Sequence, residues 1–207
     1  MNRLSAILLT TVGLMTCVAV AVAQLPHAAA TRIPVRSDSR LWLEGSSNIR
    51  DWTCRATALE ASVAIDASGG SAAPGSSREV VRGVSVNVPV RMLKCGDRHM
   101  EAEMYLALKS PKTAPGYITA EADRIPQGVV EGKLVEAEAM LTIAGVRKNV
   151  KMTVTSDVLP DGTRRARGTV PILMTDFGIK PPRPWGGILR TADKVLIQFE
   201  IFIAGQS

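Results

Sequence analysis

The sequence of 207 residues carries a formal net charge of +6, and only 4% of its residues are aromatic. Its basic residues are scattered and lack the interleaved aromatic side chains that stack on bases, so we expect no nucleic-acid partner. The mild positive balance fits a transient attraction to anionic lipid headgroups at a membrane surface.

Residues 1–23 have the pattern of a cleavable bacterial export signal. Arg3 supplies a positive start, the stretch Leu4–Val20 is almost wholly apolar or small, and Ala21-Val22-Ala23 provides small residues before a cleavage site. The alternatives are a retained membrane anchor and a lipoprotein signal ending at Cys17, although the residue before that cysteine is a poor one for lipidation. We therefore expect an exported protein that is periplasmic or secreted.

After the export signal, a chain of about 180 residues suits a single domain. Residues 24–39 are predicted to be an extended lead-in, and residues 40–205 the domain itself. No later stretch approaches the roughly 20 apolar residues that a membrane-spanning helix needs. We therefore expect the mature protein to be soluble.

Cysteine usage predicts one disulfide. Cys17 leaves with the export signal, so the mature chain keeps Cys54 and Cys95. In an oxidising compartment, an even pair is more often bonded than free. Closing a loop of roughly 40 residues would constrain the unfolded chain by roughly 4 kcal/mol in the chain-entropy description.

The first half of the domain shows alternating strand patterns. They are predicted at Arg40–Ser46, Thr53–Asp66 and Glu79–Val90, and Pro89 indicates an edge or an end of the last one. Residues 67–77 (ASGGSAAPGSS) have the low-complexity, turn-rich composition of a loop. This loop joins strands rather than domains, because neither side has enough strands to form a core alone.

One segment switches to a helical period. Over Asp97–Leu108, Met100 and Met104 stand on a four-residue repeat, Asp97 is a suitable N-cap, and Ser110-Pro111 provides a stop. The sequence predicts a single α-helix here.

The second half returns to strands and determines the fold class. In the final strand, Val195, Ile197, Phe199, Ile201 and Ile203 share one apolar face. Closing the sheet on itself would bury such a face and remove exposed edges. We predict an all-β fold, a single antiparallel barrel of about eight strands with one α-helix, whose interior is either filled by side chains or holds one slender ligand. The remaining strands and turns are Gly116–Asp123, Val129–Ile143, Ala144-Gly145, Val146–Val158, Pro160-Asp161-Gly162, Arg164–Leu173 and Lys194–Ile203.

Four motifs together carry a family resemblance: Gly45–Trp52 (GSSNIRDW), Leu141–Val154 (LTIAGVRKNVKMTV), Asp176–Ile179 (DFGI) and Lys194–Ile197 (KVLI). In their order and spacing they resemble the YceI-like family, from about Leu41 to Ala204. The resemblance implies an exported, lipocalin-like β-barrel that binds polyisoprenoids or other long-chain lipids. The insert at residues 67–77, the cysteine pair and the Met-rich stretch Met92–Met104 depart from the general family pattern.

A long isoprenoid or acyl chain needs a continuous apolar tunnel, where each buried methylene contributes roughly 0.8 kcal/mol. We expect the helix to form a lid or side wall with an adaptable methionine face, although the same residues could simply fill a solid core. Trp52 either lines a tunnel mouth or plugs the barrel end. The predicted cavity-lining residues are Trp52, Leu93, Met100, Met104, Phe177, Trp185 and Phe199.

Two other classes of function stay open at this stage. One is soft-metal or haem binding, since several soft ligands lie on and just before the helix. The other is a protein-interaction module that adds a partner's strand to an exposed sheet edge at Val80–Val90. We expect no enzyme, no catalytic residues and no resident cofactor, because His27 and His99 are the only histidines and no Ser-His-Asp arrangement can be built without His99 as the base. The candidate metal ligands are Met92, Cys95, His99, Met100 and Met104.

Overall fold

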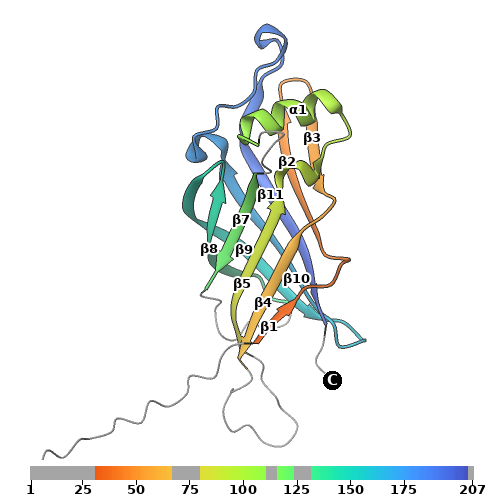
Figure 1. The fold of residues 1–207 in the computed structure, drawn as a ribbon. Coiled ribbons are helices and arrows are strands. Elements are labelled where there is room, and N and C mark those ends of the chain that lie inside the picture. The colour runs from red at the N-terminus through yellow and green to blue at the C-terminus, as the bar shows by residue number, and fades with distance from the viewer. Residues whose placement is uncertain (1–30, 67–79, 111–115, 124–131, 205–207) are drawn as a thin grey trace, which may run out of the picture.

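The computed structural model describes residues 31–66, 80–110, 116–123 and 132–204 of the protein (Figure 1). The predicted export signal, residues 24–30 of the lead-in and the predicted loop at 67–77 therefore lie outside the described residues. Among the described residues, no helix has both the length and the apolar character needed to cross a membrane.

The described residues form one antiparallel sheet of eleven strands, in the order β1-β4-β5-β7-β8-β9-β10-β11-β2-β3-β6. The all-β prediction with one helix is confirmed, while the predicted number of about eight strands is too low. The strands are β1 (Thr31–Pro34), β2 (Arg40–Ser47), β3 (Asp51–Ala56), β4 (Glu60–Asp66), β5 (Val80–Pro89), β6 (Leu93–Lys94), β7 (Tyr117–Ala122), β8 (Val135–Ile143), β9 (Val146–Val158), β10 (Arg164–Leu173) and β11 (Thr191–Ile203).

The sheet curls into a barrel-like shape (Figure 1). At each of its two edges, the chain connects strands that lie far apart in the sheet order. The chain that leaves β1 bonds to both flanks: the Val35 amide donates to the Ala61 carbonyl at 3.0 Å, and the Arg36 amide donates to the Phe202 carbonyl at 2.8 Å. At the other edge, β5 runs through a 3₁₀ turn, η1 (Val90–Met92), into β6, which pairs with β3. The apolar face of the sheet is thereby turned inward.

Three predictions for the N-terminal half of the chain differ from the structure. The predicted strand Thr53–Asp66 is two strands, because the Thr57 amide bonds to the Met92 carbonyl and turns the chain from β6 toward β5. Part of the predicted lead-in is the strand β1. The edge predicted at Val80–Val90 is wrong, since β5 pairs with β4 on one side and β7 on the other. Pro89 marks the end of that strand rather than an edge.

In the β8–β9–β10 meander, β9 and β10 have the predicted bounds, whereas β8 begins at Val135 rather than at the predicted Val129. Residues Ala144 and Gly145 have φ values of 52° and 84°, so they form the tight hairpin turn that the sequence indicates. Along β8, Ala137, Ala139 and Leu141 are buried while the intervening glutamates are exposed. This alternation places small side chains toward the inside of the curl.

Helix α1 (Arg98–Ala107) lies across one end of the curled sheet, near β2 and β3 (Figure 1). Asp97 is its N-cap as predicted, with its carboxylate accepting from the Met100 amide at 3.0 Å. Two further 3₁₀ turns, η2 (Met174–Phe177) and η3 (Trp185–Gly187), lie in the connection between β10 and β11. The α1 end of the sheet therefore carries the helix and the longest described connection.

Candidate functional site

The interior holds an upper cavity of about 480 Å³ next to α1. Its walls are apolar side chains from β2, β3, β11, the helix and the β10–β11 connection, with Met100 and Met104 contributed by α1. Its polar lining residues include Arg50, His99 and Glu103, whose side chains are exposed. The cavity therefore opens at the helix end of the sheet, and its deeper wall is hydrophobic.

A lower cavity of about 370 Å³ continues inside the strands themselves. It is lined almost wholly by valine, alanine, leucine and isoleucine from β2, β4, β5 and β7–β11, with Ser156 and Arg164 as its polar members. The small alanines of β7 and β8 leave the space that larger residues would fill. A hollow interior with an almost wholly apolar lining suits a slender apolar molecule better than a polar one.

Three residues line both cavities: Leu43 of β2, Ile118 of β7 and Ile197 of β11. Leu43 and Ile197 are partners across the β2–β11 ladder, and Ile118 belongs to a strand four places away in the sheet order. All three are less than a tenth exposed. We refer to Leu43, Ile118 and Ile197 as the septum, since they stand between the two cavities.

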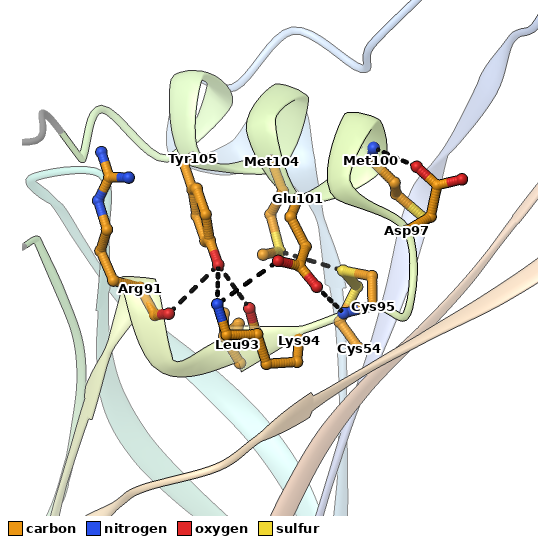
Figure 2. The surroundings of a disulfide bond; sticks show 10 residues. All are labelled: Cys54, Arg91, Leu93, Lys94, Cys95, Asp97, Met100, Glu101, Met104 and Tyr105. Atoms are coloured by element: carbon orange, nitrogen blue, oxygen red, sulfur yellow. Dashed lines mark hydrogen bonds and ion pairs between the residues drawn. A yellow bond between two sulfur atoms is a disulfide. The ribbon is translucent and has the colours of Figure 1, made fainter.

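The predicted disulfide between Cys54 and Cys95 is present and links the segment just before α1 to β3. Cys54 is only 1% exposed and lines the upper cavity. Figure 2 shows Met104 pointing from α1 toward this bond, with its sulfur 3.9 Å from the Cys95 sulfur. The Cys95 amide also donates to Glu101 of the helix at 3.1 Å. The disulfide therefore fixes the cavity wall on which α1 rests.

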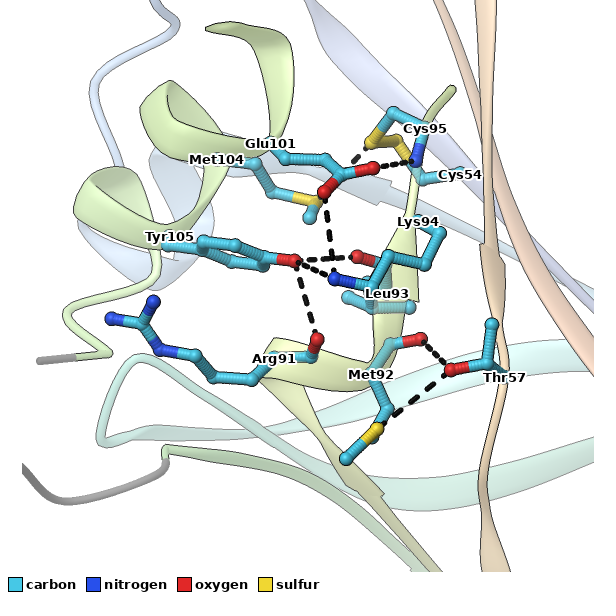
Figure 3. Close-up of polar contacts among 10 residues, drawn as sticks. All are labelled: Cys54, Thr57, Arg91, Met92, Leu93, Lys94, Cys95, Glu101, Met104 and Tyr105. Atoms are coloured by element: carbon cyan, nitrogen blue, oxygen red, sulfur yellow. Dashed lines mark hydrogen bonds and ion pairs between the residues drawn. A yellow bond between two sulfur atoms is a disulfide. The ribbon is translucent and has the colours of Figure 1, made fainter. Parts of the chain in front are cut away.

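Tyr105 provides the second attachment of the helix (Figure 3). Its hydroxyl lies 2.9 Å from the Leu93 carbonyl and 3.2 Å from the Arg91 carbonyl, and it accepts a hydrogen bond from the Lys94 ammonium at 3.1 Å. The Arg91 guanidinium stacks over the ring at 4.8 Å. The pKa of Lys94 is raised, first by the bond to Tyr105 and also by the nearby Glu101 carboxylate.

Trp52 is one of the residues that line the upper cavity. Its indole lies against Gly45, its ladder partner on β2, where any Cβ would collide with the ring. The indole Nε1 is buried and has no acceptor among the described residues. Leaving a buried N–H unpaired costs about 1–3 kcal/mol, so the packing of the indole against Gly45 carries this cost among the described residues.

Asp97 shapes the rim electrostatically as well as capping the helix. Its pKa lies below the ordinary value of 3.8, first because the Met100 amide donates to its carboxylate, and further because of His99 and Arg50 nearby. The folded state therefore favours the ionised carboxylate. The stabilisation is complete above pH 3.8 and is lost as the pH falls through the lower, folded-state pKa.

We expect acid to loosen the first turn of α1 before the sheet unfolds. Hydrogen exchange of the Met100 amide should accelerate relative to amides of β9 as the pH falls below 3.8. The variant Asp97→Asn keeps a good capping side chain that does not titrate, so it should lose this pH dependence while retaining slow exchange. The same acid dependence in Asp97→Asn would contradict this role for Asp97.

The predicted cavity residues separate into groups in the structure. Trp52, Met100 and Met104 line the upper cavity, and Phe199 lines the lower one. Phe199 crosses its ladder partner Gly168, where a side chain would collide with the ring. Contact with a ligand stays a prediction for all of these residues. Leu93 and Phe177 are fully buried in the core and are not among the residues that line either cavity, and the side chain of Trp185 lies outside the described part of the structure.

The predicted metal ligands do not converge. Cys95 is bonded to Cys54 and so offers no thiolate, and Met92 turns away from the helix toward the Thr57 hydroxyl, 3.7 Å from its sulfur (Figure 3). Among the described residues, no group of three or more His, Cys, Asp or Glu side chains could hold a metal ion.

The septum is the feature that sequence reasoning missed, because alternating apolar residues look the same in a filled and a hollow sheet.

Comparison with known proteins gives a consistent result. The sequence profile described as the YceI-like domain matches residues 37–203. The fold is similar to that of BcnA from Burkholderia cenocepacia, with a TM-score of 0.61 and 20% identity, covering 82% of this chain and 99% of that one. It is also similar to a polyisoprenoid binding domain from Saccharophagus degradans, described as implicated in plant cell wall breakdown, with a TM-score of 0.59 and 12% identity, covering 86% and 99% of the two chains. Curated protein sequences give no significant match. At these identities, the likeness to solved structures concerns the fold alone.

Proposed function

The chain belongs to the YceI-like family, and we propose that it is a non-catalytic binding protein that carries or sequesters a long-chain amphiphilic lipid inside its curled sheet. The ligand class we propose is a polyisoprenoid, an isoprenoid quinone or an acyl lipid. The structurally similar domain from Saccharophagus degradans is described as polyisoprenoid binding. We further propose that residues 1–23 direct export to the periplasm or beyond, on the basis of their sequence pattern.

The observation that carries this proposal is the pair of adjoining apolar cavities of about 480 and 370 Å³. A single chain that passes the septum would bury its methylenes at both levels, and each would contribute roughly 0.8 kcal/mol. The charged lining groups stand at the open rim of the upper cavity, where a polar headgroup would remain in contact with water.

The first test is native mass spectrometry and organic extraction of the protein purified from a bacterial periplasm. We expect a stoichiometric extra mass that extracts as an isoprenoid or acyl lipid. A folded protein that carries no lipid, and takes up none when incubated with polyprenyl phosphate or ubiquinone, would refute the proposed function.

Met104→Lys tests whether α1 forms part of the cavity wall. Placing an ammonium in an apolar cavity costs several kcal/mol, so we expect lipid affinity to fall by about a hundredfold or more. Leu106→Lys is the matched control, because Leu106 lies on the same helix and is 75% exposed. Equal retention of lipid by both folded variants would remove the helix from the cavity wall.

A further inference from the structure

Two loops at the mouth of the upper cavity are joined into one surface. They are the turn at residues 47–50 and the connection at residues 180–190. Asn48 links them: its side-chain amide donates to the Ile188 carbonyl at 2.9 Å, and its side-chain oxygen accepts from the Arg190 amide at 2.7 Å. Its backbone amide also donates to the Arg190 carbonyl at 3.1 Å. We call this surface the mouth loops.

The mouth loops present large apolar side chains to solvent. Ile49 is 58% exposed and Ile188 is 71% exposed, and each lies next to or bonds to Asn48. Nothing in the fold requires isoleucine at two turn positions, where polar residues and glycine usually occur. Their exposure on linked loops leaves both isoleucines without apolar cover.

Within the mouth loops the charge is predominantly positive, and the nearest carboxylates of the helix segment at this rim are Asp97, close to Arg50, and Glu103. The described residues 47–51 and 180–191 carry one carboxylate, Asp51, and four cations. Arg183 and Arg190 make no ion pair with any described residue, and the Arg190 side chain donates to the Gly187 carbonyl at 3.3 Å. Exposed apolar tips surrounded by arginine and lysine are the features of a protein surface that binds an anionic lipid interface. The four cations are Arg50, Lys180, Arg183 and Arg190.

The same loops border the opening of the upper cavity. Ser47 and Arg50 from the first loop, and Pro182, Pro184 and Leu189 from the second, are among its lining residues. A long apolar chain that left this opening into water would lose its burial energy. Contact between the mouth and a bilayer removes that cost, because the chain passes from one apolar medium to another.

We propose that the mouth loops dock on the surface of a bilayer that contains anionic phospholipid. Ile49 and Ile188 enter the interface between headgroups and acyl chains, and the arginines of the mouth loops contact lipid phosphates. The direction of docking, with the cavity mouth toward the membrane, rests on the proposed function, whereas the docking surface itself rests on the exposed isoleucines and their cations.

Co-sedimentation with vesicles tests this surface. The periplasmically purified protein should bind phosphatidylcholine vesicles that contain about 30% phosphatidylglycerol and should not bind pure phosphatidylcholine vesicles. Ile49→Ser combined with Ile188→Ser should reduce binding at least tenfold, and Arg183→Ser should reduce it about fivefold. Leu134→Ser is the matched control: Leu134 is 68% exposed and precedes β8 at the opposite end of the sheet, so this variant should bind like the parent protein.

The vesicle and ligand results can be separated. The loop variant should melt at the parent temperature and should still carry any bound lipid, because neither isoleucine lines a cavity. Parent protein that ignores anionic vesicles, or a loop variant that binds them as well as the parent, would overturn the docking proposal. A parent protein that binds vesicles but carries no lipid, and takes up neither polyprenyl phosphate nor ubiquinone, would refute the carrier function and support the docking surface.

Discussion

Removal of the Cys54–Cys95 disulfide is expected to lower the free energy of unfolding by about 4 kcal/mol, the largest effect of any single bond in this structure. The two cysteines are 41 residues apart in sequence, so the bond excludes many extended conformations of the unfolded chain. The test is chemical denaturation of Cys54→Ala combined with Cys95→Ala, compared with the oxidised parent. Alanine avoids the buried hydroxyl that serine would place at Cys54.

The disulfide also has an expected consequence for the upper cavity. It holds the residues before α1 against β3, and Met104 of the helix packs against its sulfur. Without the bond, α1 keeps the Tyr105 contacts, the Glu101 bond and the packing of Met100 and Met104 against the core. We expect faster hydrogen exchange in α1 than in β9 in the double variant. A reductant should destabilise the parent by the same amount and leave the double variant unchanged, whereas a stability loss below about 1 kcal/mol would show that the unfolded chain is already compact there.

The predictable parts of the fold are those with strong local signals. Strands β9 and β10 have the predicted bounds, because each has a regular period and a glycine turn at its start. The break between β3 and β4 was not predicted, since Thr57–Leu59 contains no glycine or proline. The two residues of β6 are too few to show a period. Their pairing with β3 depends on the whole curl rather than on local sequence.

The sequence predicted which side of the helix points toward the candidate site, but it did not predict which apolar residues line a cavity and which pack in the core. The four-residue repeat that carries Met100 and Met104 correctly indicates one side of a helix, and both residues line the upper cavity. Phe177 lies in a motif of the same apolar character, yet it is 1% exposed and packs in the core. An apolar repeat of two or four residues tells which face of a strand or helix a side chain belongs to. Whether that side chain borders a cavity or is packed in the core is determined by side chains from distant strands. The hollow interior therefore appears only in three dimensions.

The septum is expected to set the length of chain that the protein holds. Ile118 lies opposite the neighbouring pair Leu43 and Ile197, so a larger side chain at position 118 would close the passage between the cavities. Ile118→Phe should confine a ligand to the upper cavity. Each methylene excluded from the lower cavity would then reduce affinity about fourfold. Extraction of lipids from the purified variant should show shorter chains than extraction from the parent.

The control for this prediction is Ile118→Val, which keeps the branched shape, opens rather than closes the passage and should retain the parent ligand. Both variants change a residue that is 7% exposed, so each needs a thermal melt, and overpacking by phenylalanine is expected to cost about 1–3 kcal/mol. A folded Ile118→Phe variant that holds the parent's chain lengths would mean that the ligand never passes the septum. The lower cavity would then be a packing void, and the upper cavity of about 480 Å³ would by itself limit the size of the ligand.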